Sequence, residues 1–190
     1  MGHETISDVT ALGLSITFAL CLLMIIVPRK YALVPVLILT CFMPMAQQLV
    51  LGGLHFPMLR ILMIFGWMRL LVRRELRKIE FNPIDWAVLI WLVVSVINFT
   101  IMWGTTEALV NRLGHAYNVI GTYFMFRYLI IDLEDAKKVF RLTAIYVIPL
   151  ALAMLFEYKT QRNPFAVLGA VNPITVIREG ILRCQGPFQH

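Results

Sequence analysis

Arginines at the edges of long apolar stretches are the residues of this sequence best suited to chemistry. Arg60 and Arg112 lie near the ends of two such stretches, and Arg178 and Arg183 lie in the more polar segment 157–190. The planar guanidinium group makes paired, charge-assisted hydrogen bonds to phosphate oxygens. We therefore expect these four residues to bind a phosphate or pyrophosphate group. Ordinary contact with phospholipid headgroups is an alternative interpretation of all four.

Other catalytic patterns are missing from the sequence. No Cys/His pair has the spacing of metal ligands, and no glycine-rich phosphate loop precedes a helix. The four histidines are scattered along the chain: His3, His55, His115 and His190. We therefore expect no metal and no cofactor, and we assign no catalytic residue.

The composition indicates that a membrane protein positions these arginines. Of the 190 residues, 59% are hydrophobic and 15% are charged, against about 45–50% and about 25% in soluble proteins. Six stretches are long enough to cross a hydrocarbon core of about 30 Å as helices: 9–27, 32–51, 56–72, 84–103, 113–131 and 139–156. Continuous apolar stretches exclude the alternating strands of an outer-membrane barrel. We predict an all-α integral membrane protein, with about six spans over 1–156 and an external segment over 157–190.

The lysines and arginines of the loops predict the orientation. Nine of them follow the first, third and fifth stretches: Arg29, Lys30, Arg73, Arg74, Arg77, Lys78, Lys137, Lys138 and Arg141. Only Arg112 lies between the fourth and fifth stretches. The positive-inside rule places the nine in the cytoplasm, and the N-terminus and 157–190 outside. The net charge of +6 is then a topology signal, and we expect no nucleic-acid partner.

Two motifs in 157–190 resemble those of a known family. Arg183-x-x-Gly186-x-Phe188-x-His190 resembles the pattern R-x-x-G-x-F-x-H-P of the O-antigen ligase and polysaccharide polymerase superfamily. Residues 157–165, EYKTQRNPF, resemble the segment E-x-x-T-G-x-N-P-F that often precedes it, with Gln161 in place of glycine. Residues 121–138 also look like the equivalent segment of the family. The resemblance covers about 56–190.

The resemblance implies an enzyme of the bacterial inner membrane. Such an enzyme transfers a glycan from undecaprenyl pyrophosphate to a glycan or lipid-core acceptor at the periplasmic face. Arg183 would contact the pyrophosphate, while Gly186, Phe188 and His190 would be structural. Family members continue into further spans and a large external loop that carries the catalytic residues. We therefore expect the chain to be the N-terminal part of an incomplete polytopic bundle, inactive by itself.

Other functions stay open at this point. A transporter or flippase of lipid-linked oligosaccharide predicts charges deep inside the spans, whereas these arginines lie near the ends. A non-catalytic membrane assembly subunit predicts interfaces of small residues and no external basic cluster. Ligase and polymerase share the donor and differ in the acceptor, so both remain possible within the favoured class.

Overall fold

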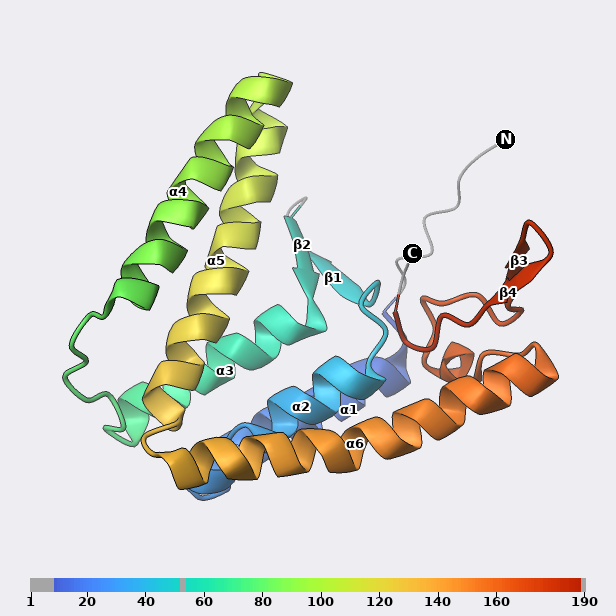
Figure 1. The fold of residues 1–190 in the computed structure, drawn as a ribbon, viewed down its shortest axis with the longest axis horizontal. Helices are drawn as coiled ribbons and strands as arrows, with labels where there is room; N and C mark the ends of the chain where they lie inside the picture. The colour runs from blue at the N-terminus through green and yellow to red at the C-terminus, as the bar shows by residue number, and fades with distance from the viewer. Residues whose placement is uncertain (1–8, 52–53, 189–190) are drawn as a thin grey trace. The chain divides into compact units, whose positions relative to one another are not determined.

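The computed structural model describes residues 9–51 and 54–188 (Figure 1). They are mostly helical, which confirms the predicted helical character, although two short β-hairpins and two 3-10 turns are also present. The helices are α1 (Ala11–Ile26), α2 (Val34–Phe42), α3 (Met58–Val72), α4 (Pro83–Trp103), α5 (Thr106–Leu129) and α6 (Leu133–Thr160). The hairpins are β1 (Gln48–Leu51) with β2 (Leu54–Pro57), and β3 (Val176–Arg178) with β4 (Ile181–Arg183). The 3-10 turns are η1 (Arg29–Tyr31) and η2 (Pro164–Leu168).

The chain forms two compact units. The first contains residues up to Gly66 and from Ile130 onward, and the second runs from Trp67 to Leu129. In the first unit α1, α2 and α6 lie side by side (Figure 1). Their buried apolar side chains, such as Met24, Leu39 and Leu150, form its core.

The second unit is built on the antiparallel pair α4 and α5. A capping box starts α4, because Asn82 and Asp85 each accept a hydrogen bond from the backbone N–H of the other. Such a box satisfies backbone donors that the first helical turn leaves unpaired. Gly104 ends α4 with φ of +62°, a left-handed conformation that costs glycine little. Leu92 and Ala108 are buried in the pair.

The second apolar stretch differs from the prediction. It contains a helix of only 9 residues, and the expectation of one helix over 32–51 is wrong. Met43 is extended, with φ of −90° and ψ of 128°, because Pro44 disfavours helical backbone in the residue before it. The chain then enters β1, whose Gln48 pairs with Pro57 of β2. At about 1.5 Å per residue α2 is about 14 Å long, short of a hydrocarbon core.

Two of the helices in the described part of the chain are long and apolar enough to cross a membrane, namely α4 and α6. Only 11% and 6% of their most apolar windows are buried within the protein. Large apolar side chains such as Ile101 and Phe140 are exposed. Crossing by the other predicted stretches stays a prediction.

Candidate functional site

The end of α6 and the segment after it form the most connected polar site of the first unit. Gln161 ends the helix in the left-handed conformation, with φ of +55°, and its N–H donates to the carbonyl of Glu157. Its own carbonyl accepts from the N–H of Thr175 at 3.0 Å. Residues 161–188 therefore fold back onto the last turn of α6, of which Glu157 is part.

The Glu157 carboxylate is the centre of this site and is fully buried. It accepts hydrogen bonds from the Thr175 hydroxyl at 3.2 Å and from the backbone N–H groups of Gln185 and Gly186 at 3.0 and 2.8 Å. Successive backbone N–H groups form an anion-binding concavity, here filled by a side chain of the same protein. These donors satisfy a carboxylate that would otherwise be costly to bury.

Asn163 secures the same turn from the other side. Its Nδ2 donates to the Gly186 carbonyl at 2.7 Å, while its Oδ1 accepts from the N–H of Phe165 at 2.9 Å. Gly186 has φ of +57°. A Cβ there would lie 3.4 Å from Cγ of Met154. The left-handed backbone conformation therefore favours glycine, whereas a Cβ would make only ordinary contact with Met154.

The predicted motif residues of segment 157–190 that the structure describes lie on or beside the turn at Gln185 and Gly186. Arg183 is exposed in β4, where it pairs with Val176. Arg178 belongs to the partner strand β3, so the structure brings these two arginines into one hairpin. Phe188 is half-buried, and its N–H donates to the Gln185 carbonyl at 3.1 Å. His190 lies outside the described residues.

Cys184 lies between Arg183 and the Glu157-bound turn and is half-buried. Burial raises the pKa of its thiol, and the negative charge of Glu157 raises it further. The thiol is therefore less reactive at neutral pH than an ordinary exposed cysteine.

Arg60 lies in the first turn of α3, in the same unit as residues 157–188. Its Nη1 donates to the His55 carbonyl at 2.9 Å, and its guanidinium lies 5.7 Å from the centre of the Phe56 ring. Arg60 is therefore held against β2, at the start of α3.

Arg112 belongs to the second unit and lies well inside α5. We expected it to open a helix beginning near residue 113, but α5 begins seven residues earlier than that, at Thr106. The short linker after Gly104, with Thr105 accepting from the N–H of Ala108, starts the helix sooner than hydropathy indicates. The guanidinium of Arg112 lies 4.0 Å from the centre of the Phe99 ring.

A buried glutamine, Gln47, links three segments of the first unit. Nε2 of Gln47 donates to the Thr10 hydroxyl at 3.0 Å and to the Leu168 carbonyl, so it joins the start of α1 to η2. A Cβ at Gly13 would overlap Oε1 of Gln47. An amide next to a proline-interrupted apolar stretch was the only signal of this contact in the sequence.

The second unit contains a buried polar cluster that was also missed. Asp85 accepts from the Tyr123 hydroxyl at 2.6 Å and from Nη2 of Arg127 at 2.8 Å. Asp85 is fully buried. The segment Asn82-Pro83-Ile84-Asp85 has the pattern of a helix start, which could have revealed the cap but not its two partners on α5.

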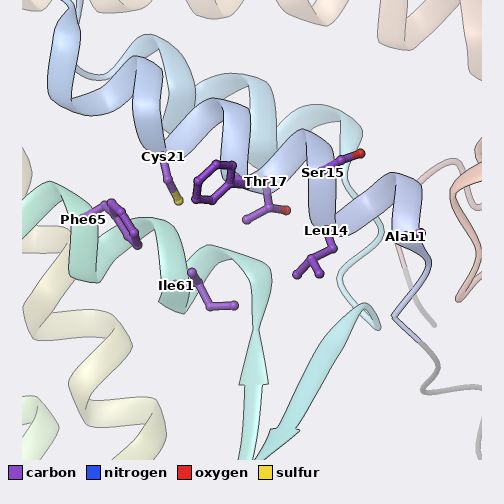
Figure 2. Close-up of a pocket in the computed structure, with 8 residues that line it drawn as sticks. Ala11, Leu14, Ser15, Thr17, Cys21, Ile61 and Phe65 are labelled. Atoms are coloured by element: carbon purple, nitrogen blue, oxygen red, sulfur yellow. The ribbon is translucent and has the colours of Figure 1, made fainter.

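An apolar groove of about 420 Å³ lies between α1 and α3 in the first unit. Figure 2 shows Leu14 and Cys21 of α1 facing Ile61 and Phe65 of α3 across it. Its lining carries no charged side chain, so the groove suits a hydrocarbon surface better than a phosphate group.

Metal ligands do not gather in the part of the chain that the structure describes. Within 9–51 and 54–188, no group of three or more His, Cys, Asp or Glu side chains is placed to hold a metal ion.

Comparisons with known proteins add no relative to this picture. No protein-family model, no curated protein and no solved structure matches the chain.

Proposed function

We propose that the chain forms the N-terminal part of a multi-pass glycosyltransferase of the bacterial inner membrane, similar to O-antigen ligases and polysaccharide polymerases. Its donor is a glycan carried on undecaprenyl pyrophosphate. Its acceptor is a sugar hydroxyl of a glycan or a lipid core at the periplasmic face.

The observation that carries the proposal is the junction between the two motifs of the resemblance. Glu157 and Asn163 are matched polar positions of the first motif, and Gly186 is a matched position of the second. The Glu157 carboxylate accepts from the N–H of Gly186, and the Asn163 amide donates to its carbonyl. Matches arising by chance in separate segments would not be expected to bond to one another.

The one departure from the first motif also has a structural explanation. Gln161 stands where the family pattern has glycine, and it is the left-handed residue that ends α6. Glycine is the residue most often found at this position of a helix end. The pattern and the backbone conformation therefore agree, and glutamine adopts the same conformation at a modest cost.

Membrane placement is supported by the exposure of α4 and α6. The core helix of a soluble protein would bury most of its apolar side chains, whereas these two helices bury few of theirs. Covering such surface with lipid removes it from water. The positive side chains of the loops favour the cytoplasmic face for residues 29–30, 73–78 and 137–141.

Arg183 is our first choice for the pyrophosphate contact. It is exposed, it lies in a hairpin with Arg178, and the Glu157-bound turn follows two residues later. Departure of the glycan leaves negative charge on the pyrophosphate, which a positioned guanidinium stabilises more strongly as the charge develops. Arg60 is a second candidate in the same unit, and Arg112 is treated separately below.

The experiment is carried out in membranes that contain the complete protein. We expect Arg183→Ala to abolish transfer of labelled glycan from the lipid-linked donor, and Arg183→Lys to retain only part of it. Lys159→Ala, which removes an exposed positive charge at the end of α6, is the matched control and should stay active. Full activity of Arg183→Ala at normal protein level would contradict the proposed contact.

The same membranes distinguish the transporter alternative. A flippase would move the lipid-linked oligosaccharide between leaflets of sealed vesicles without forming a new glycosidic bond. Transport without transfer would replace the enzyme proposal with the transporter.

A further inference from the structure

Two buried polar atoms without hydrogen-bond partners lie on facing helices of the second unit. They are Oγ1 of Thr100, near the end of α4, and Nε of Arg112, on α5. Among the described residues of this unit, Nε of Arg127 is a third such atom, but Nη2 of that guanidinium is already paired with Asp85. Buried polar atoms almost always have a partner. A hydroxyl and a guanidinium N–H can both donate to one negatively charged oxygen.

The guanidinium of Arg112 is held in place by an aromatic ring. It stacks on Phe99, the residue before Thr100, at 4.0 Å from the ring centre. This contact brings the cation to the same turn of α4 that carries the unpaired hydroxyl. Cation–ring stacking stabilises the guanidinium while its in-plane N–H groups stay available for hydrogen bonds.

Among the described residues, no carboxylate forms an ion pair with Arg112. Glu107 and His115 are the other titratable residues on the first three turns of α5. Neither forms an ion pair with Arg112 in the described ranges of the chain. A guanidinium that is partly buried beside apolar surface is costly unless an anion accompanies it. As far as the structure describes the chain, the site therefore has no negative group of its own.

The position of Arg112 along the helix suits the level of lipid headgroups. Arg112 is six positions after Thr106, where α5 begins, which is about 9 Å along the axis. Long side chains on helices lean toward the N-terminus, so its guanidinium reaches back toward the turn at Gly104. In a bilayer crossed by α4, this turn lies at one surface.

We propose that Arg112 and Thr100 form a phosphate-binding site, with Phe99 as its platform. Nε–H of Arg112 and the hydroxyl of Thr100 donate to an oxygen of the phosphate. The phosphate comes from the headgroup of an anionic phospholipid or from solution. The site needs only the membrane placement of α4 from the proposed function and no glycan transfer, so either can fail alone.

The test uses the full chain, purified in a sugar detergent and phosphate-free buffer. Phosphatidylglycerol or inorganic phosphate is added, and the midpoint of thermal unfolding is measured. With saturating ligand we expect the wild-type midpoint to rise by about 3 °C or more. Arg112→Gln should lose the shift, and Arg112→Lys, which keeps the charge without the planar fork, should lose most of it. Arg74→Gln makes the same charge change before α4 and should keep the shift.

Thr100→Val tests the role of the hydroxyl, because it should change the midpoint of thermal unfolding differently with and without ligand. Without added ligand, valine removes an unpaired buried hydroxyl, so the midpoint should equal or exceed that of the wild type. With ligand, the shift of Thr100→Val should be at most half of the wild-type shift. A response to phosphatidylglycerol alone identifies a lipid headgroup, and a response to both probes identifies phosphate in general. Equal shifts in the wild type and Arg112→Gln, or no shift with either probe, would overturn the site.

Discussion

The Glu157 carboxylate accepts a hydrogen bond at 2.8 Å from the backbone N–H of Gly186, 29 residues further along the chain. Both groups are buried, and the bond fixes the turn after Arg183 against the last turn of α6. The conformation of residues 161–188 therefore depends on one negatively charged side chain. This dependence leads to the first prediction.

Glu157→Gln should loosen the turn without changing its volume. The new amide group replaces the oxygen that faces the N–H of Gly186, so a buried donor loses its acceptor. We expect a loss of about 1–3 kcal/mol in the free energy of unfolding, measured by denaturant titration in detergent. Glu134→Gln, at an exposed surface pair with Lys137, should cost less than about 0.5 kcal/mol. Equal effects of the two substitutions would contradict the structural role of Glu157.

The reactivity of Cys184 should report on the same turn. Burial and the charge of Glu157 raise the pKa of this thiol, and only the thiolate reacts with alkylating agents. In a variant that keeps Cys184 as its sole cysteine, the alkylation rate should therefore reach half its maximum above about pH 8.5, the pKa of an ordinary thiol. Adding Glu157→Gln removes the negative charge and should lower this midpoint. A midpoint at or below that of a free thiol in the parent variant would refute the expected burial of Cys184.

Asp85→Asn should destabilise the second unit. Oδ2 of Asp85 accepts from both Arg127 and the N–H of Asn82, and Oδ1 accepts from the Tyr123 hydroxyl. Asparagine keeps an oxygen at only one of these two positions and loses the negative charge that pairs with Arg127. We expect a loss of about 1–3 kcal/mol, because the buried Asp85 side chain loses a charge-assisted hydrogen bond to the partly exposed Arg127. Tryptophan fluorescence can follow this unfolding, since Trp86 and Trp91 lie on α4.

Asp132→Asn is the matched control for Asp85→Asn. Asp132 is exposed at the N-cap of α6, where asparagine caps as well as aspartate. Its stability should change by less than about 0.5 kcal/mol. If Asp85→Asn were equally neutral, the ion pair between Asp85 and Arg127 would not be formed in solution.

Gly13→Ala should disturb the contact between α1 and Gln47. Its new Cβ would overlap Oε1 of Gln47, and overpacking of this kind costs about 1–3 kcal/mol. Adding Gln47→Ala opens the space, so Gly13→Ala should then cost much less. A double-mutant cycle measures this coupling, and additive effects would exclude the contact.

Reporter fusions test the membrane orientation of the proposal. Fusions after Glu107 and Arg162 should report the periplasm, and fusions after Lys30, Lys78 and Lys138 should report the cytoplasm. An inverted pattern would place Arg183 on the wrong face for a periplasmic acceptor.

Hydropathy predicted where helices occur better than where they end. It placed α4 within one residue of its observed start, but it merged α2 with β1, since both are apolar. The difference between these two elements lies in how backbone groups are paired. Pro44 was the local sign of a break, and pairing of Gln48 with Pro57 depends on the following segment.

The candidate residues of the site could be selected from the sequence only where they occupy matched positions of the resembling motif. Arg183 and Gly186 could be selected from their spacing within a resembling pattern. The bond from Gln47 to Leu168 spans 121 residues, and the carboxylate that holds Gly186 lies on another element. Such contacts depend on tertiary packing, for which a single sequence carries no periodic signal. The partners of Asp85 on α5 were missed for the same reason.

The short α2 has a consequence for the parity of membrane crossings. In the proposed membrane placement, the segment between Lys30 and Arg73 would run outward through α2 and β1 and return through β2 and α3. Such a path leaves both ends of the segment on the same side of the membrane. This holds whether the 9-residue helix α2 reaches the opposite surface or the chain turns back midway. The side assigned to every later element is therefore insensitive to how deep this excursion goes. Evolution could lengthen or shorten it without inverting the rest of the protein.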